Sequence, residues 1–413
     1  MYAEDIVVPP TITRPLNSAQ LLAEGDAGEQ CRLGGPRRSQ SVAIQSARNR
    51  NGNSNGVAVG LRGTCNPTLV ARQAVRSDRR PWYLEGNRVR HSFDNNRVVR
   101  DTGCRFPIFN APVGYFARAQ LAGAVSAAGG MGLMETSSAS LDETAAQFDL
   151  VRARTDAPLG LQMFLRVLKG QGRVDEVLDW TLDGRTRLLV TCVGDPTPIA
   201  RRAREADVRL YHQVGSLNDA LRAVDAGVDG LIVEGAESGG LRGVRSPHLF
   251  TLLQQVRAKV EVPLIAAGGI ADGHGMAGAF ALGAEGVVMG TRFMSSVESP
   301  VHDNWKQAIT DCDVTLNVDP GMNGIRMRVA GNEFGEAVFR GEVDPAGNPY
   351  AGPFLEAFEH GRVDLAMVGC GESASLIGSI KTVGEIIDET VTVFWEQIER
   401  LAHLLSRTGN QAG

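Results

Sequence analysis

The feature that most constrains the fold is a regular alternation of short apolar runs and helix-like segments between Phe106 and Met289. The runs are continuously apolar, which is typical of strands covered on both faces, as in parallel sheets. Segments between them, such as Leu217–Ala226 and Pro247–Val260, have the periodicity of helices. The eight runs are 106–111, 131–134, 159–164, 187–192, 209–214, 230–234, 263–267 and 286–289. Eight strand–helix units in succession predict an α/β fold of the closed (β/α)8 type, a TIM barrel.

The remaining parts of the chain predict additions to this barrel. Two short apolar runs, 82–84 and 89–93, flank Gly86-Asn87 and predict a hairpin. A final helix is expected from about Val383 to Leu405. We therefore expect four regions. They are 1–100, an N-terminal extension, partly irregular; 101–295, the barrel; 296–369, an insertion after strand eight or a small helical lid; and 370–413, a C-terminal helix packing on the barrel.

Composition narrows the partners and the compartment. The net charge is -5, so electrostatics gives no reason to expect nucleic acid or a membrane surface as partner. No signal peptide opens the chain, and no run approaches the roughly 20 apolar residues of a membrane span. Six cysteines are scattered singly with no C-x-x-C pair, a usage typical of reduced thiols. We expect a cytoplasmic protein that binds a small molecule and has no metal site.

The loops after strands seven and eight carry the strongest chemical signal. Ala267, Gly268 and Gly269 end the seventh strand, and Gly290 and Thr291 follow the eighth. TIM barrels often build a phosphate site from these two loops. Glycines let backbone N–H groups approach an anion, and the threonine adds a hydroxyl donor. The alternative is that Gly-Gly merely makes a tight turn between strand and helix.

A third glycine-rich loop follows strand six. It runs from Gly235 to Gly240 and includes Glu237 and Ser238. Its glycines would allow a flat ring system or a sugar-like chain to lie against the main chain. The alternative is a flexible surface loop without a ligand.

Six motifs in order along the chain resemble the nitronate monooxygenase family, formerly called 2-nitropropane dioxygenase, which is similar to FMN-dependent enoyl-ACP reductases. The likeness covers roughly Phe106 to Leu405. The motifs are Pro107-Ile108 with Ala111-Pro112, Gly129-Gly130-Met131-Gly132, Gly160-Leu161-Gln162-Met163-Phe164, Gly235-Ala236-Glu237-Ser238-Gly239-Gly240, Ala267-Gly268-Gly269-Ile270-Ala271-Asp272-Gly273 and Met289-Gly290-Thr291-Arg292-Phe293.

The resemblance implies FMN, with its ring system over the backbone that follows strand one. Gln162 stands where the family usually has Asn, and Glu234 stands where Gln is usual. The resemblance also leaves a homodimer open as the assembly. The cofactor-binding residues that it implies are Ala111, Pro112, Val113, Gln162, Glu234, Gly239, Gly240, Ala267, Gly268, Gly269, Gly290 and Thr291.

One departure from the family concerns the catalytic base. The family motif ends Gly-Gly-His, and here Leu241 occupies the position of that histidine. Leucine cannot accept a proton, and general base catalysis contributes typically about 10²–10⁴-fold. His212, at the end of strand five, is expected to point toward the mouth of the barrel, the opening at the C-terminal ends of its strands. It is the first candidate to replace the base. The alternative for His212 is a hydrogen bond within the barrel rim.

Further candidates for the missing base lie on loops at the same end of the barrel. Glu237, Tyr115 and Glu135 are ionisable there, whereas His248 is expected to cap or pack a helix. Cys192 is more typical of a small core residue than of a nucleophile.

Three hypotheses for the function follow. The first is an FMN-dependent oxidoreductase of the nitronate monooxygenase type, in which a small organic substrate reduces the flavin and O2 accepts the electrons. The second keeps FMN but makes the protein an NAD(P)H-using enoyl reductase or a double-bond isomerase in a specialised pathway. The third is a flavin-binding protein without turnover, whose basic N-terminal segment binds a partner.

Overall fold

Eight parallel strands form a barrel in the computed structural model, which describes residues 91–321, 324–345 and 353–408. Their order around the sheet is β1-β9-β8-β6-β5-β4-β3-β2, and a parallel bridge between Phe109 and Met131 joins β1 to β2. The expected TIM barrel and all eight expected strands are confirmed. The strands are β1 (Ile108–Asn110), β2 (Gly132–Glu135), β3 (Leu159–Phe164), β4 (Leu188–Cys192), β5 (Arg209–Val214), β6 (Gly230–Glu234), β8 (Leu264–Ala267) and β9 (Gly286–Met289).

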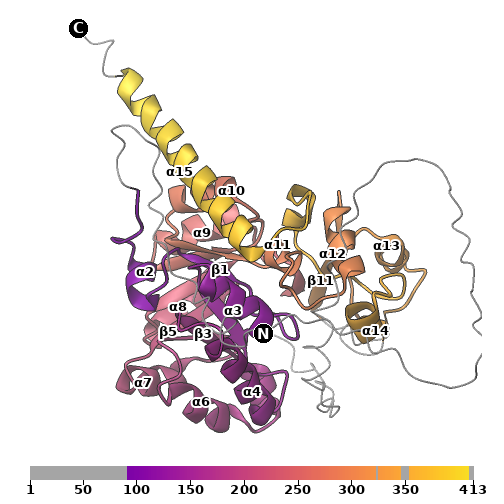
Figure 1. Ribbon diagram of the computed structural model, residues 1–413, viewed down its shortest axis with the longest axis horizontal. Coiled ribbons are helices and arrows are strands. Elements are labelled where there is room, and N and C mark those ends of the chain that lie inside the picture. Colours follow the sequence, from indigo (N-terminus) through magenta and orange to yellow (C-terminus); the bar gives the residue numbers. More distant parts are fainter. Residues whose placement is uncertain (1–90, 322–323, 346–352, 409–413) are drawn as a thin grey trace, which may run out of the picture. The chain divides into compact units, whose positions relative to one another are not determined.

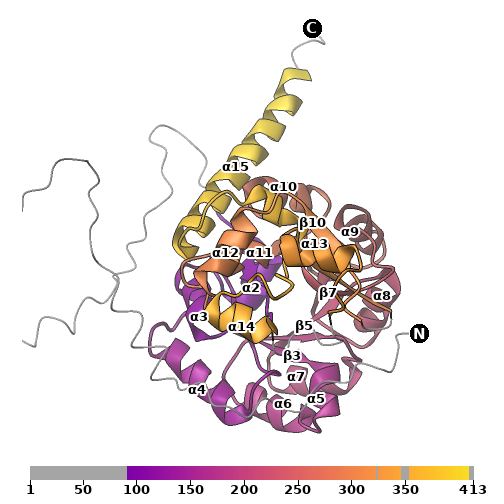
Figure 2. The ribbon, with the colours of Figure 1, turned by 90° about the vertical axis from the view of Figure 1, so that its right-hand side faces the viewer.

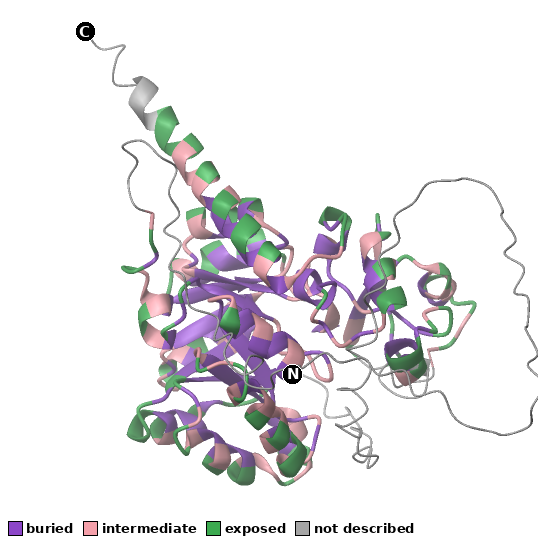
Figure 3. Ribbon diagram, viewed as in Figure 1, coloured by how far each residue is buried: buried purple, intermediate pink, exposed green. Residues whose placement is uncertain are grey.

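Helices connect consecutive strands and surround the barrel as a ring (Figure 2). Figure 3 shows that the strands are buried, while the exposed residues gather on the helices. The connecting helices are α3 (Ala119–Ala127), α4 (Leu141–Arg152), α5 (Leu165–Gly170), α6 (Val174–Leu182), α7 (Thr197–Glu205), α8 (Leu217–Asp225), α9 (Leu249–Arg257) and α10 (Gly273–Ala281). A short helix, α11 (Thr291–Met294), follows the last strand, β9. Among the described helices, none is long and apolar enough to cross a membrane.

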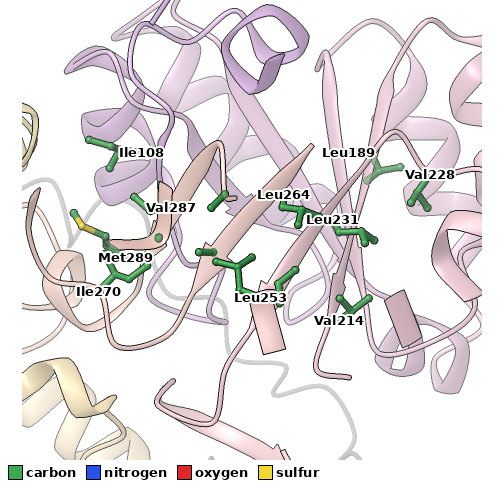
Figure 4. Packing of buried hydrophobic residues seen from close by; sticks show 14 of the residues in the cluster. Ile108, Leu189, Val214, Val228, Leu231, Leu253, Leu264, Ile270, Val287 and Met289 are labelled. Atoms are coloured by element: carbon green, nitrogen blue, oxygen red, sulfur yellow. The ribbon is translucent and has the colours of Figure 1, made fainter. Parts of the chain in front are cut away.

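Strand residues alternate between two apolar clusters. One cluster fills the barrel interior and includes Phe109, Leu133, Val190 and Ile232. The other lies between the strands and the helices; it includes Leu189 and Leu231, and Figure 4 shows part of it. Side chains alternate along a strand, so a residue next to one of the interior cluster faces the helices, and a residue two positions away faces the barrel axis.

Helix α2 (Arg97–Thr102) covers the N-terminal end of the barrel. Val98 belongs to the interior cluster, and Asp101 accepts a 2.8 Å hydrogen bond from the Tyr211 hydroxyl inside the barrel. Asn96 caps the helix through its side chain. The hairpin expected around Gly86-Asn87 falls almost entirely outside the described residues.

A small lobe lies beside the C-terminal ends of the strands, with α12, α13 and α14 grouped together in Figures 1 and 2. Its three-stranded antiparallel sheet has the order β10-β11-β7. Strand β7 comes from the loop after β6, so the lobe and the barrel share that loop. The lobe elements are β7 (Gly240–Gly243), α12 (Asp303–Thr310), β10 (Thr315–Val318), β11 (Ile325–Ala330), α13 (Glu333–Phe339), α14 (Pro353–His360) and the 3-10 helix η2 (Glu372–Leu376).

Helix α15 (Val383–Thr408) packs along α10, and its far end projects from the barrel (Figure 1). Gly273 opens α10 and lies directly against the α15 backbone at Thr390 and Phe394. Aromatic packing of Phe93 with Phe394 and Trp395 continues the contact. Glycine is needed at this crossing because a Cβ on residue 273 would overlap the partner backbone.

Candidate functional site

The C-terminal ends of the strands present a layer of polar side chains toward the barrel axis. Cys192, Gln213 and Glu234 each lie two positions after a residue of the interior cluster on strands β4 to β6. Gln162 of β3 lies two positions after Gly160, whose added Cβ would meet Leu133 and Leu188 of that cluster. Gln162 Nε2 donates to Cys192 Sγ at 2.8 Å, and Gln213 Nε2 donates to Glu234 Oε2 at 2.8 Å. Four neighbouring strands therefore place amides, a thiol and a carboxyl side by side at the mouth.

Burial shifts the two ionisable groups of this layer toward their neutral forms. It raises the pKa of the Glu234 carboxyl, against the opposing effects of Ser238, Gln213 and Arg242. It also raises the pKa of the Cys192 thiol far above its ordinary value, with the nearby carboxylates of Glu234 and Glu135 adding to the shift. Burial therefore favours the neutral form of the Cys192 thiol, which is a weaker nucleophile than the thiolate.

Gln162 leaves a polar atom open at the mouth. Its Oε1 is buried and has no hydrogen-bond partner within the described residues. A buried amide oxygen without a donor costs about 1–3 kcal/mol, so its position favours a bound molecule that supplies an N–H or O–H group.

Glycines from three loops form a cradle beside this layer. Gly268 and Gly269, after β8, have φ angles of 104° and 72°, in the left-handed region that favours glycine. A Cβ at Gly268 would lie 3.1 Å from the Ser238 nitrogen, and one at Gly290 would lie 3.2 Å from the Ala111 Cβ. The loop after β8 thus meets the loop after β6, and the loop after β9 meets the end of β1.

A fourth segment completes the cradle, and sequence reasoning missed it. The Gly371 backbone nitrogen donates to Thr291 Oγ1 at 2.8 Å. A Cβ on Gly239 would lie 2.7 Å from the Cys370 carbonyl carbon and 2.8 Å from the Gly371 nitrogen. The glycines flanking Cys370, immediately before the short helix η2, were the available signal, but nothing local links them to loops about 80 residues away.

The His212 side chain lies on the outer face of β5, away from the barrel axis. It lies between the inward residues Tyr211 and Gln213, so it has the outward orientation of Leu210 and Val214. Its Nδ1 is joined to Thr191 Oγ1 by a 2.8 Å hydrogen bond, and the ring is 5% exposed. The expectation that His212 points toward the mouth is corrected by this placement: the ring is hydrogen-bonded within the barrel wall, which was the alternative.

The environment of His212 predicts a loss of stability in acid. Burial lowers its pKa to about 4, against the weaker opposing effects of Asp219 and Asp195. As pH falls through 6.5, the unfolded chain therefore binds a proton that the folded chain excludes, and stability falls by up to about 3 kcal/mol by pH 4. Urea unfolding between pH 7 and 4 should show this slope. His212→Gln should reduce it, and equal slopes in both proteins would contradict the assignment.

Leu241 lies on β7 and pairs with Met327 of β11. Its half-buried side chain packs at the edge of an apolar cluster that includes Leu316, Val329 and Met367. Leu241 therefore continues the apolar core of the lobe.

Two buried arginines attach the lobe to the loop after β6. Arg242 donates to the Ser238 carbonyl and to Asn317 Oδ1, while Arg328 donates to the Ala236 carbonyl and pairs with Glu372 at 2.8 Å. Burial and the neighbouring Arg328 lower the pKa of Arg242 to about 10, so it stays cationic at neutral pH. Sequence reasoning did not single out either arginine.

The other candidate bases are engaged by protein groups. Glu135 accepts hydrogen bonds from the Ser137 and Ser138 backbone nitrogens, and both Glu237 oxygens accept from the Leu249 nitrogen. His248 is the N-cap residue of α9 and its ring is largely exposed. Burial raises the pKa of Tyr115, which keeps its phenol neutral.

Comparison with known proteins finds similarity over most of the chain. The family model for nitronate monooxygenase matches residues 96–174 and 167–393. A nitronate monooxygenase of Neurospora crassa is 28% identical over 346 residues, which cover 71% of this chain and 90% of that protein. The structure of FabK from Thermotoga maritima has a TM-score of 0.68 and 33% identity, and the match covers 75% of this chain and 99% of that one.

A second group of relatives is similar over a shorter stretch. A (3aS,4S,5R,7aS)-5-hydroxy-7a-methyl-1-oxo-octahydro-1H-indene-4-carboxyl-CoA dehydrogenase of Mycobacterium tuberculosis is 32% identical over 206 residues. The match covers 50% of this chain and 57% of that protein, so the chain spans little more than half of the relative's length.

Proposed function

Since the chain belongs to the nitronate monooxygenase family, whose model matches most of it, we propose that it is an FMN-dependent oxidoreductase that acts on a small organic substrate. In this proposal a nitronate or a similar electron-rich compound reduces the flavin, and O2 takes up the electrons. The observation that carries the proposal is the open oxygen of Gln162 beside a four-segment glycine cradle.

The residues at the mouth fit FMN. Gly268, Gly269, Gly290 and the Thr291 hydroxyl would hold the phosphate, because their loops bring backbone N–H groups together at the ends of β8 and β9. When bound, FMN would supply the electron transfer.

Further residues would position the ring system. The open Gln162 Oε1 would accept a hydrogen bond from a donor of the cofactor, and Ala111 with Pro112 and Val113 would provide backbone at the β1 end. Gly239 and Gly240 would continue the wall between phosphate and ring. Leu241 and its apolar neighbours would keep water from one side of the site.

The test is anaerobic mixing of the flavin-loaded protein with a panel of nitronates. We expect the flavin absorbance to bleach within the turnover time and to return when O2 is admitted. An unchanged spectrum across the whole panel would contradict the proposal. A colourless protein that fails to bind added FMN would contradict the assignment of the cofactor as well.

A second candidate is an NAD(P)H-dependent enoyl reductase or a double-bond isomerase. The likeness to FabK and to the carboxyl-CoA dehydrogenase supports it, together with Leu241 at the position of the family's base. Stopped-flow mixing with NADPH and NADH discriminates the reductase, because rapid bleaching by either would assign the electron donor. A flavin-binding role without turnover is the third reading, and it fails if any substrate turns over at enzymatic rates.

A further inference from the structure

Glu234 is an ionisable group that points into the barrel at the C-terminal end of a strand. It ends β6, two positions after Ile232 of the interior cluster, so its side chain has the inward orientation. Gln213 Nε2, from the same side of neighbouring β5, donates to one carboxyl oxygen at 2.8 Å. The amide fixes the direction of the carboxyl without neutralising it.

The groups around Glu234 favour reversible protonation of its carboxyl group. Cys192 of β4 faces it as a neutral thiol, Ser238 faces it from the following loop, and Arg242 faces it from β7. Burial raises the pKa of the Glu234 carboxyl while Ser238, Gln213 and Arg242 oppose the shift. A carboxyl whose pKa is moved toward neutrality exchanges protons more effectively near physiological pH than an ordinary one.

Competing groups at this end of the barrel are excluded by their contacts or orientation. Glu135 accepts the backbone N–H groups of Ser137 and Ser138, and Glu237 accepts that of Leu249, so both carboxyl groups are already bound by protein groups. His212 faces away from the mouth and is hydrogen-bonded to Thr191. The Leu241 side chain can neither donate nor accept a proton.

We propose that Glu234, oriented by Gln213, exchanges the substrate proton at the mouth, in the role that a histidine at position 241 would fill. The inference rests on the proposed function. For a neutral nitroalkane, the carbon–hydrogen bond breaks and the proton bonds to a Glu234 oxygen. The electron pair passes to the nitro group and leaves a nitronate, so no oxidant or reductant is needed for this step. A preformed nitronate has already lost that proton and bypasses Glu234.

The experiment compares both forms of one substrate with wild-type protein, Glu234→Gln and Glu234→Asp. Under anaerobic conditions, Glu234→Gln should slow flavin reduction by the neutral nitroalkane about 100-fold or more. It should slow reduction by the preformed nitronate much less, so that the ratio of the nitroalkane rate to the nitronate rate falls well below that of wild type. Glu234→Asp keeps a shorter carboxylate and should retain part of the rate. Wild type should react faster with the nitroalkane as pH rises through the Glu234 pKa, because the acceptor must be ionised, and the Gln variant should lose this dependence.

Equal slowing with both substrate forms would overturn the proposal, since it would show a role only in holding the cofactor. A readout without substrate is the infrared carbonyl band of a protonated carboxyl in the FMN-loaded protein. The band should titrate above the range of ordinary carboxyls in wild type and be missing in Glu234→Gln. Its absence from wild type would also overturn the proposal. If no nitronate reduces the wild-type flavin, the proposed function fails. The titration of the infrared band then tests by itself whether Glu234 exchanges a proton.

Discussion

Replacing Gly239 with alanine should weaken the proposed binding of FMN about 10- to 100-fold. The added Cβ would lie 2.7 Å from the Cys370 carbonyl carbon and 2.8 Å from the Gly371 nitrogen, closer than real Cβ atoms come. Both contacts are backbone atoms and cannot rotate away, so one loop must move. Overpacking of this kind costs about 1–3 kcal/mol, and every 1.4 kcal/mol is a tenfold change in affinity. The shift would also disturb the hydrogen bond from Gly371 to Thr291.

The measurement is a fluorescence titration of the flavin-free protein with FMN. Gly215→Ala is the matched control because it lies after β5 at the same end of the barrel and its added Cβ would meet no atom within 4 Å. We expect the control to bind FMN like wild type. Unchanged affinity in Gly239→Ala, with a normal circular dichroism spectrum, would remove the cradle from the cofactor site.

Replacing Gly273 with alanine should destabilise the protein by about 1–3 kcal/mol or more, because the new methyl group would overlap the α15 backbone at Thr390 and Phe394. Helix α15 cannot retreat without separating Phe394 from Phe280 and Phe93. The expected result is a lower urea midpoint and faster hydrogen exchange in α15 than in the barrel strands.

Gly278→Ala controls for the change of residue type in the same helix. It lies in α10, and its added Cβ would meet nothing within 4 Å. Alanine in place of glycine inside a helix is favourable by about 1 kcal/mol, so the control should be as stable as wild type or more stable. A Gly273→Ala protein with wild-type stability would show that α15 is not held by close backbone packing.

The cradle shows how far local reasoning reaches. Gly268, Gly269, Gly290 and Thr291 could be predicted to lie at the same end of the barrel, because a TIM barrel places the ends of adjacent parallel strands together; their role as a phosphate site stays a prediction. The contribution of Gly371 could not be predicted, since its contact with Thr291 spans 80 residues and depends on how the lobe folds back.

The inward layer was only partly predictable for a different reason. Gln162 and Glu234 were recognised from the resemblance, whereas Gln213 was missed and His212 was assigned to the wrong side of β5. A strand buried on both faces is apolar on both, so hydrophobic alternation does not reveal which residues face the axis. The closed barrel decides this, because Tyr211 and Ile232 pack inside it.

The amino-acid sequence by itself determined the strand–helix alternation, the barrel class and the glycine loops at the strand ends. These follow from short-range physics, since apolar periodicity selects elements and glycine permits tight turns wherever it stands. Tertiary structure alone decided which side chains share the mouth and where the lobe meets the barrel, and it gave Glu234 rather than His212 the inward position. Such relations join residues far apart in the chain, and only the closure of the barrel and the packing of the lobe bring them together.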